Sequence, residues 1–379
     1  MYKNMTKNSK KLALTGGYAA AEALKQINPD VMAVYPITPQ TPIIEVFSKF
    51  KSDGEVDTEV IHVESEHSAI SACVGSSAAG ARTVTATSSQ GLALMNEILY
   101  IASGLRRPIL MLVSARALAA PLNIHGDHSD VMGARDSGWV QIFCSTPQEV
   151  YDKTIVGMKL AEKVKLPVMV IMDGFNTSHS VENMEILEKE AVQKFVGEYS
   201  PEKYLLDIDN PVTFGPVALQ NSYFEFRKDL SDAFDTVEGE LEKIYEEYGH
   251  ISGRSYKKIE KYKLEDAEKI LVAMGSVGGT IKDAIDKLRE DGEKVGLLEI
   301  SLFRPFPYEE VKKALKDTKE VIVLDRNLAF GTKQVLASEI SHSIGKKVKS
   351  VVYGLGGRDT FQKQIMDLVK GDNQSGYLL

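Results

Sequence analysis

Short apolar segments alternate with longer mixed segments over the first half of the chain. Five runs of apolar or β-branched residues have the length of buried strands, and they cover residues 31–34, 60–63, 83–87, 109–113 and 167–172. Helical patterns separate them at residues 16–24, 65–80 and 90–101. Strands that alternate with helices indicate a mostly parallel sheet, so we predict a doubly wound α/β domain.

The alternation stops near Glu182, and prolines at 201, 211 and 216 interrupt the pattern that follows. We predict an irregular crossing segment over residues 182–229 and a charged helix over residues 230–248. Together they complete a first predicted domain of residues 1–250. The basic, polar run at 257–263 has the composition of a linker.

A second α/β unit follows, and we predict a second domain at residues 258–379. Its predicted strands cover residues 270–274, 295–300, 321–324 and 351–353. Its predicted helices cover residues 279–291, 308–316 and 333–345. The same alternation indicates a second parallel sheet.

The composition of the 379 residues narrows the class of protein. A net charge of −8 argues against nucleic-acid binding, and no run reaches the ~20 apolar residues of a membrane helix. Residues 1–11 are polar and precede too short an apolar run for a secretory signal, so we expect an irregular end in a cytoplasmic protein. The two cysteines, Cys73 and Cys144, allow no disulfide framework, and we expect ordinary buried residues.

A proline-rich loop, Tyr-Pro-Ile-Thr-Pro-Gln-Thr-Pro at 35–42, directly follows the first predicted strand. We expect its three prolines to exclude a helix and to restrict the backbone. Ligands of open α/β sheets bind at the carboxyl ends of the strands. We therefore expect Thr38 to face a ligand.

Other polar side chains follow the carboxyl ends of the neighbouring strands, and they are Glu66, Ser89, Gln90, Arg116 and Asp173. Because parallel strands end at one edge of a sheet, we expect these side chains to converge. Two of them have alternative interpretations. Glu66, like Glu64, can simply stabilise the N-terminus of a helix. Arg116 can pair with a structural carboxylate, or it can bind a substrate carboxylate through two parallel hydrogen bonds.

Two further motifs are open to more than one interpretation. His125, His128 and the aspartates beside them can bind a metal, but they lack the helical spacing of two histidines, so we favour a loop shaped by its own hydrogen bonds and predict no metal site. The specific roles of the two histidines stay open. Residues 275–280 resemble a phosphate-binding turn with an incomplete glycine pattern, so we favour a tight turn.

In their order along the chain, these motifs resemble the α subunits of pyruvate:ferredoxin oxidoreductases, in the 2-oxoacid:ferredoxin oxidoreductase family. The resemblance rests on the 35–42 loop, Glu-Ser-Glu-His at 64–67, Thr-Ser-Ser-Gln-Gly at 87–91, Ser-Ala-Arg-Ala at 114–117 and Asp-His-Ser-Asp at 127–130. It continues at 173–175, 303–307 and 354–359, and so spans nearly the whole chain.

The resemblance implies a pyrimidine-type thiamine diphosphate domain followed by a transketolase C-terminal-like α/β domain. By that likeness, Glu66 hydrogen-bonds N1′ of the aminopyrimidine, which favours the tautomer that takes the C2 proton of the thiazolium. Thr38 and Arg116 match the residues that hold the carboxylate of pyruvate. Ser89 and Gln90 are the further residues that we expect to bind the cofactor.

The motif that binds diphosphate and Mg²⁺ in thiamine enzymes, Gly-Asp-Gly with a later Asn, does not occur in this sequence. Nor can two cysteines hold a [4Fe–4S] cluster, which takes four thiolates. The resemblance places the Mg²⁺ motif and at least one cluster on a β subunit and the other clusters on a ferredoxin-like δ subunit, and a γ subunit completes the complex. We therefore expect this chain to form half of a shared active site.

The activity that the resemblance implies is reversible oxidative decarboxylation of pyruvate with coenzyme A, which yields acetyl-CoA and CO₂ and passes electrons to ferredoxin. Two alternatives stay open: a branched-chain enzyme that acts on 2-oxoisovalerate, and a non-catalytic scaffold subunit. The presence of Thr38, Glu66 and Arg116 argues against the scaffold, and the run at 123–128 favours pyruvate.

Overall fold

The structure is a computed structural model that describes residues 10–373 and 375–379. The irregular end expected at 1–11 therefore lies mostly outside the described residues. Lys10 and Lys11 do not fit that expectation, because they begin strand β1 (Lys10–Thr15). This strand pairs antiparallel with β8 (Val181–Ile186) in a separate two-stranded sheet.

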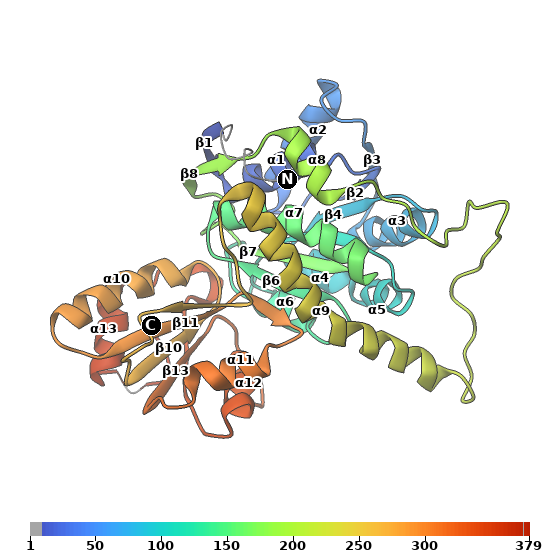
Figure 1. The fold of residues 1–379 in the computed structure, drawn as a ribbon. Helices are drawn as coiled ribbons and strands as arrows, with labels where there is room; N and C mark the ends of the chain where they lie inside the picture. The colour runs from blue at the N-terminus through green and yellow to red at the C-terminus, as the bar shows by residue number, and fades with distance from the viewer. Residues whose placement is uncertain (1–9, 374) are drawn as a thin grey trace.

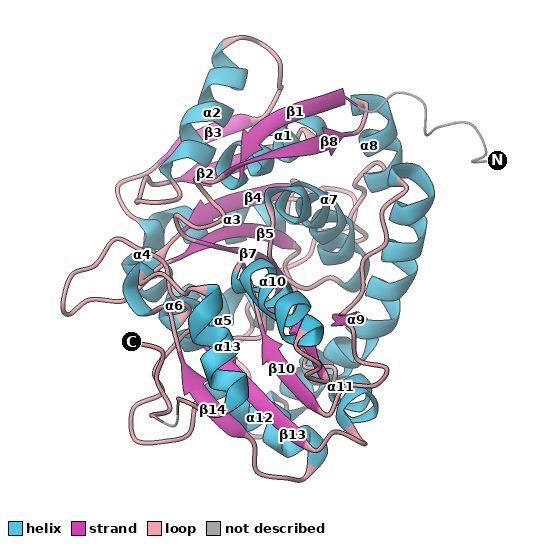
Figure 2. Ribbon diagram, turned by 90° about the vertical axis from the view of Figure 1, so that its left-hand side faces the viewer, coloured by secondary structure: helices cyan, strands magenta, loops and turns pink. Residues whose placement is uncertain are grey.

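A seven-stranded sheet organises the first half of the chain in the order β12-β6-β7-β5-β4-β2-β3 (Figures 1 and 2). The five predicted strands are confirmed as β2 (Val31–Val34), β3 (Glu59–His62), β4 (Thr83–Thr87), β5 (Ile109–Ala115) and β7 (Val168–Asp173). They pair in parallel with one another. Strand β6 (Val140–Cys144) is absent from the prediction because Gln141 interrupts its apolar run.

Helices cover both faces of this sheet, as the doubly wound prediction requires. One face packs against α1 (Gly16–Ile27), α2 (Thr41–Ser52) and α7 (Pro147–Val164). The other packs against α3 (Glu66–Ala78), α4 (Ser89–Leu94) and α5 (Asn96–Gly104), so the helix predicted at 90–101 is in fact two.

The proline-rich loop is shorter than predicted, because α2 begins inside it at Thr41. Pro42 lies in the first turn of α2, where the missing N–H of proline is not needed. The expectation that the prolines exclude a helix is therefore wrong for residues 41–42.

The predicted irregular segment at 182–229 is also partly wrong. It contains β8 and α8 (Lys189–Val196), and α9 (Tyr223–Ser252) begins before its end. Its longest stretch with neither helix nor strand is residues 197–222. In Figure 1 this stretch leaves the body near α3, extends outward on the right and returns to the start of α9.

A five-stranded sheet organises the second half in the order β14-β13-β10-β11-β9. The predicted strands are confirmed as β10 (Lys269–Ala273), β11 (Val295–Ile300), β13 (Glu320–Asp325) and β14 (Lys349–Val352). The predicted helices are confirmed as α10 (Val277–Glu290), α11 (Tyr308–Leu315) and α12 (Val335–Ile344), and the turn η1 (Leu355–Gly357) and α13 (Gln362–Lys370) follow.

The predicted linker at 257–263 is wrong, because it contains β9 (Ile259–Tyr262), which pairs antiparallel with β11. An edge strand exposes one side of its backbone, so lysines are common there and the sequence lacks a continuous apolar run.

The two halves share a sheet and a core. Strand β12 (Leu302–Arg304) comes from the second half but pairs antiparallel with β6 in the first sheet. The rings of Phe143, on β6, and Phe303, on β12, meet edge to face with their centroids 6.0 Å apart. The domain division between residues 250 and 258 stays a prediction.

No helix within residues 10–373 and 375–379 is long and apolar enough to cross a membrane.

A buried carboxylate fixes the end of the long helix α9. Asp152, on α7, is completely buried and accepts two hydrogen bonds from Arg254, from Nε at 2.6 Å and from Nη2 at 2.7 Å. The hydroxyls of Tyr248 and Tyr256 also donate to it. Because removal of one partner from such a group leaves a buried charge without compensation, this pair is sensitive to substitution.

We predict that Arg254→Met lowers the free energy of unfolding by about 3 kcal/mol, measured by urea titration. The matched control is Arg227→Met on the exposed side of α9, which should change it by less than about 0.5 kcal/mol. Equal effects of the two substitutions would contradict a specific role for the Asp152–Arg254 pair.

Candidate active site

Glu66 lies in the first turn of α3, just beyond the carboxyl end of β3. The hydroxyl of Ser65 caps the helix by accepting the N–H of Ser68 at 3.2 Å, and the helix dipole favours a carboxylate at this end. Glu66 is only 7% exposed, yet its carboxylate has no hydrogen bond or ion pair to any described residue. Glu64, in contrast, accepts the hydroxyl of Ser68 at 2.6 Å, as expected for a helix-terminal carboxylate.

Gly91 lies directly against this carboxylate. A Cβ atom at residue 91 would lie 2.7 Å from Glu66 Oε1 and 2.5 Å from Thr87 Oγ1. The Thr87 hydroxyl is itself buried and has no hydrogen-bond partner in the described part of the chain. Because Gly91 has no side chain, the Glu66 carboxylate and the Thr87 hydroxyl can both lie against its backbone.

Arg116 follows β5 and links two loops through its guanidinium group. Nη1 donates to the carbonyl oxygen of Thr38 and Nε to that of Asn123, both at 2.9 Å. Burial lowers the pKa of Arg116, and the nearby Asp130 opposes this shift. Within residues 10–373 and 375–379 no carboxylate lies within ion-pair distance of the guanidinium, so the structural ion pair considered from the sequence is absent there.

Asp130 connects the ends of β4 and β5. Its Oδ2 accepts the backbone N–H of Ser89 at 2.8 Å and that of Arg116 at 3.0 Å, while Oδ1 accepts the N–H of Val131 at 2.7 Å. Burial raises the pKa of Asp130 to about 7, against the effect of these N–H donors. Asp130 belongs to one of the sequence motifs, but no role was predicted for it.

The five predicted site residues lie along one edge of the sheet. Arg116 contacts Thr38 directly, Asp130 joins Arg116 to Ser89, and the hydroxyl of Ser89 donates to Oε1 of Gln90 at 2.7 Å. Gln90 precedes the Gly91 that contacts Glu66. Thr38 and Gln90 are exposed, whereas the other three are buried, so the group opens to the surface at one side.

A second buried polar cluster holds the segment after Arg116 against the second half of the chain. His128 Nε2 lies 2.6 Å from Asp173 Oδ1, and Arg326 Nη1 lies 2.9 Å from Asp173 Oδ2. The backbone N–H of Ser276 also donates to Oδ2 at 2.7 Å. Burial opposes ionisation of Asp173, but Arg326 and His128 outweigh it and lower its pKa.

These contacts bear on the two ambiguous motifs. Ser276, in the turn that resembles a phosphate site, binds the Asp173 carboxylate. His125 lies at the surface with its ring 4.8 Å from that of Phe175. Among the described residues, no group of three or more His, Cys, Asp and Glu side chains is arranged to hold a metal ion.

Other expectations from the sequence can be compared with the structure directly. Cys73 and Cys144 are free and buried, as expected, and burial raises the pKa of Cys73 to about 12. Sequence reasoning missed Arg326. The only signal for it was an Asp-Arg-Asn run directly after a predicted strand.

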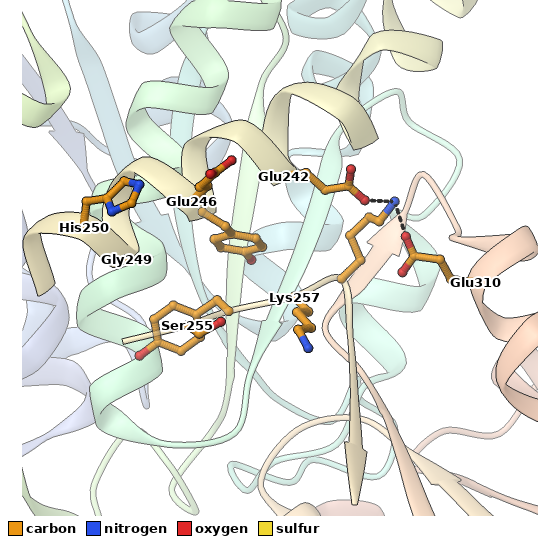
Figure 3. Close-up of a pocket in the computed structure, with 10 residues that line it drawn as sticks. Glu242, Glu246, Gly249, His250, Ser255, Lys257 and Glu310 are labelled. Atoms are coloured by element: carbon orange, nitrogen blue, oxygen red, sulfur yellow. Dashed lines mark ion pairs between the residues drawn. The ribbon is translucent and has the colours of Figure 1, made fainter. Parts of the chain in front are cut away.

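A cavity of about 510 Å³ lies between the second half of α9 and residues 255–258 (Figure 3). Lys258 lies at its edge and forms ion pairs with Glu242 at 2.8 Å and Glu310 at 2.5 Å. None of the predicted site residues lines this cavity, so it is separate from the candidate active site.

Comparisons with known proteins agree with this arrangement. Residues 22–246 match the profile "Pyruvate flavodoxin/ferredoxin oxidoreductase, thiamine diP-bdg". Residues 267–365 match "Pyruvate:ferredoxin oxidoreductase core domain II".

The chain is similar to curated proteins over nearly its full length. It is 50% identical to pyruvate synthase subunit PorA of Thermotoga maritima, over 96% of this chain and 95% of the relative. It is 49% identical to the same subunit of Methanocaldococcus jannaschii, over 91% and 90%. The ketoisovalerate oxidoreductase subunit VorA of Pyrococcus horikoshii is 42% identical, over 94% and 92%.

Two solved structures share the fold. A 2-oxoglutarate:ferredoxin oxidoreductase from Magnetococcus marinus superposes with a TM-score of 0.76 at 20% identity, covering 96% of this chain and 65% of that protein. A split-gene transketolase superposes with a TM-score of 0.56 at 10% identity, covering 95% and 98%. The family resemblance inferred from the motifs is therefore confirmed: this chain belongs to the thiamine-diphosphate-binding pyruvate flavodoxin/ferredoxin oxidoreductase family.

Proposed function

We propose that the chain is the α subunit of a pyruvate synthase. With its partner subunits it converts pyruvate and coenzyme A to acetyl-CoA and CO₂ and passes the electrons to ferredoxin. The observation that carries the proposal is Glu66, which is only 7% exposed at the sheet edge and whose carboxylate has no partner among the described residues. Its oxygens are not among the fully buried polar atoms, so the carboxylate is held at the helix end and stays available to a ligand.

The residues around Glu66 fit the aminopyrimidine of thiamine diphosphate. Bound thiamine diphosphate supplies a carbon nucleophile and an electron sink for the loss of CO₂. Glu66 would hydrogen-bond N1′ of the pyrimidine, and the bare backbone at Gly91 keeps that carboxylate unobstructed. The Thr87 hydroxyl lies beside the same glycine, and the exposed Gln90 directly precedes it in the chain. The backbone N–H of Ser89 holds the turn by donating to Asp130.

Arg116 and Thr38 would bind the carboxylate of the substrate. Nε and Nη1 of Arg116 already donate to main-chain carbonyls, whereas Nη2 has no hydrogen bond to the described residues. Each terminal nitrogen carries two N–H groups, so N–H groups of both Nη1 and Nη2 remain for the two parallel bonds to the carboxylate, and the exposed Thr38 hydroxyl adds a further donor. The carbonyl contacts hold the guanidinium in place before the substrate arrives.

The rest of the active site would lie on other chains. The diphosphate and Mg²⁺ need a motif that this sequence lacks, and each [4Fe–4S] cluster needs four thiolates where this chain has two cysteines. We assign the diphosphate, the Mg²⁺ and at least one cluster to a β subunit and the other clusters to a ferredoxin-like δ subunit, with a γ subunit as the remaining partner. Free buried thiols are typical of a reducing compartment, which supports a cytoplasmic location.

The substrate assignment is tested with the reconstituted complex. We expect acetyl-CoA formation from pyruvate to exceed acyl-CoA formation from 2-oxoisovalerate by at least about tenfold in kcat/KM, because one pocket discriminates such side chains by about 1–3 kcal/mol. The comparison matters because a ketoisovalerate relative is 42% identical to this chain. A preference for 2-oxoisovalerate would contradict the proposal.

We predict that Glu66→Gln lowers turnover of pyruvate in the assembled complex by at least about 100-fold, because an amide cannot share a proton with N1′ as a carboxylate does. Native mass spectrometry should show unchanged assembly. Glu64→Gln, at the same helix end, is the matched control and should retain activity. Near-normal turnover by the Glu66 variant would show that Glu66 has no catalytic role.

We predict that Arg116→Ala raises the KM for pyruvate by at least about tenfold and changes thiamine diphosphate affinity much less. Arg116→Lys keeps the positive charge but loses the planar guanidinium, so its KM should lie between those of the wild type and Arg116→Ala. Steady-state kinetics and cofactor titration separate the two effects. An unchanged KM would remove Arg116 from the carboxylate site.

A further inference from the structure

The longest irregular segment of the described chain, residues 197–222, is here termed the arm. It joins α8 to α9 and extends away from the body on the side of α3 (Figure 1). Connections of this length without secondary structure are uncommon in compact proteins and are usually functional. Large apolar side chains are exposed along the arm and on the first turn of α9, and they are Leu205, Leu206, Ile208, Val217, Leu219, Tyr223, Phe224 and Phe226.

Several contacts anchor the arm to the body, and at its start Lys165 forms an ion pair with Glu202 at 2.8 Å. The backbone N–H of Leu205 donates to the carbonyl oxygen of Ala78, the last residue of α3, at 2.8 Å. Further along, the guanidinium of Arg107 lies 4.1 Å from the ring centroid of Phe214. Between and beyond these anchors, Ile208 and Val217 are 89% and 90% exposed. The arm therefore presents apolar side chains from fixed positions, which is typical of a docking element.

Helix α3 lies between the candidate active site and the arm. It begins with Glu66 and ends at the anchor on Ala78, a distance of about 20 Å for a helix of this length. Helices α4 and α5 follow from Ser89, and they expose the apolar residues Leu94, Tyr100 and Ile101. A chain that completes the site at Thr38 and Glu66 and extends along α3 would reach the arm.

The charge of the arm indicates what it contacts. Residues 197–222 contain four acidic residues, Glu198, Glu202, Asp207 and Asp209, and one lysine, Lys203, so the arm has a net charge of −3. An apolar surface with acidic residues between its hydrophobic side chains is complementary to an apolar surface bordered by lysine or arginine.

We propose that the arm docks onto the subunit that binds the diphosphate and Mg²⁺ of thiamine diphosphate. This inference rests on the proposed function, because it needs a second chain to complete the site. The arm then contacts that subunit about one length of α3 away from the cofactor. Its side chains become buried only in the complex, which explains their exposure in the single chain.

The test uses the double variant Ile208→Ser, Val217→Ser as a full-length chain, which is titrated with the purified diphosphate-binding subunit. The matched control is Val181→Ser, at an exposed end of β8 away from the arm. We expect the double variant to bind the diphosphate-binding subunit at least about tenfold more weakly, as measured by titration with the purified subunit, and the control to bind normally. Thermal unfolding of both single chains should match the wild type, because the replaced side chains are exposed.

Three outcomes would overturn the inference. Wild-type affinity in the double variant would show that the arm does not bind this subunit. Equal weakening by the control would show a general effect of surface substitution. Loss of a homodimer, with the affinity for the other subunit unchanged, would show that the arm binds a second copy of this chain. Pyruvate turnover by the wild-type complex is measured separately, so failure of the arm inference leaves the proposed function intact.

Discussion

The buried carboxylate of Asp173 joins the two halves of the molecule at the carboxyl ends of their sheets. It ends β7 in the first sheet, receives Ser276 from the end of β10, and pairs with Arg326 from the end of β13. His128 brings the segment after β5 to the same place. A buried charge of this kind is stable only while its partners stay in position, so it requires the carboxyl ends of both sheets to face each other. The loops of the candidate active site follow the carboxyl ends of the first sheet, so their positions depend on this arrangement of the two sheets.

The candidate site depends on main-chain contacts as much as on side chains. Asp130 holds the backbone of Ser89 and Arg116, and Arg116 holds the carbonyl oxygens of Thr38 and Asn123. These bonds use the polar groups that strand ends leave without partners, and they fix three loops without occupying Glu66 or the Thr38 hydroxyl. The hydrogen bonds hold the backbone of the three loops, while the Glu66 carboxylate and the Thr38 hydroxyl stay open to a ligand. This is the arrangement expected of a site that is preorganised for catalysis.

Part of this structure follows from the sequence because burial imposes simple patterns. Strands β5 and β7 are buried on both faces, so their apolar runs are nearly continuous and were predicted. Strands β1, β8, β9 and β12 lie at sheet edges or in the small sheet, where one side needs no apolar residues, and were missed. The strand-end rule likewise located Thr38, Glu66 and Arg116. It could not locate the contacts of Asp130 with Ser89 and of Arg326 with Asp173, because they join residues 41 and 153 positions apart.

Strand β12 lies in the second half of the chain but belongs to the first sheet, and this has a consequence for folding during synthesis. Its partner in the first sheet, β6, pairs with it across about 160 residues of sequence. During synthesis, β6 therefore has an open edge until the second half of the chain has left the ribosome. Unpaired edges invite association with other strands, so this edge is a point where the unfinished chain is open to misassembly. For the same reason, a chain truncated near residue 250 would expose that edge permanently, whatever the stability of the remaining core.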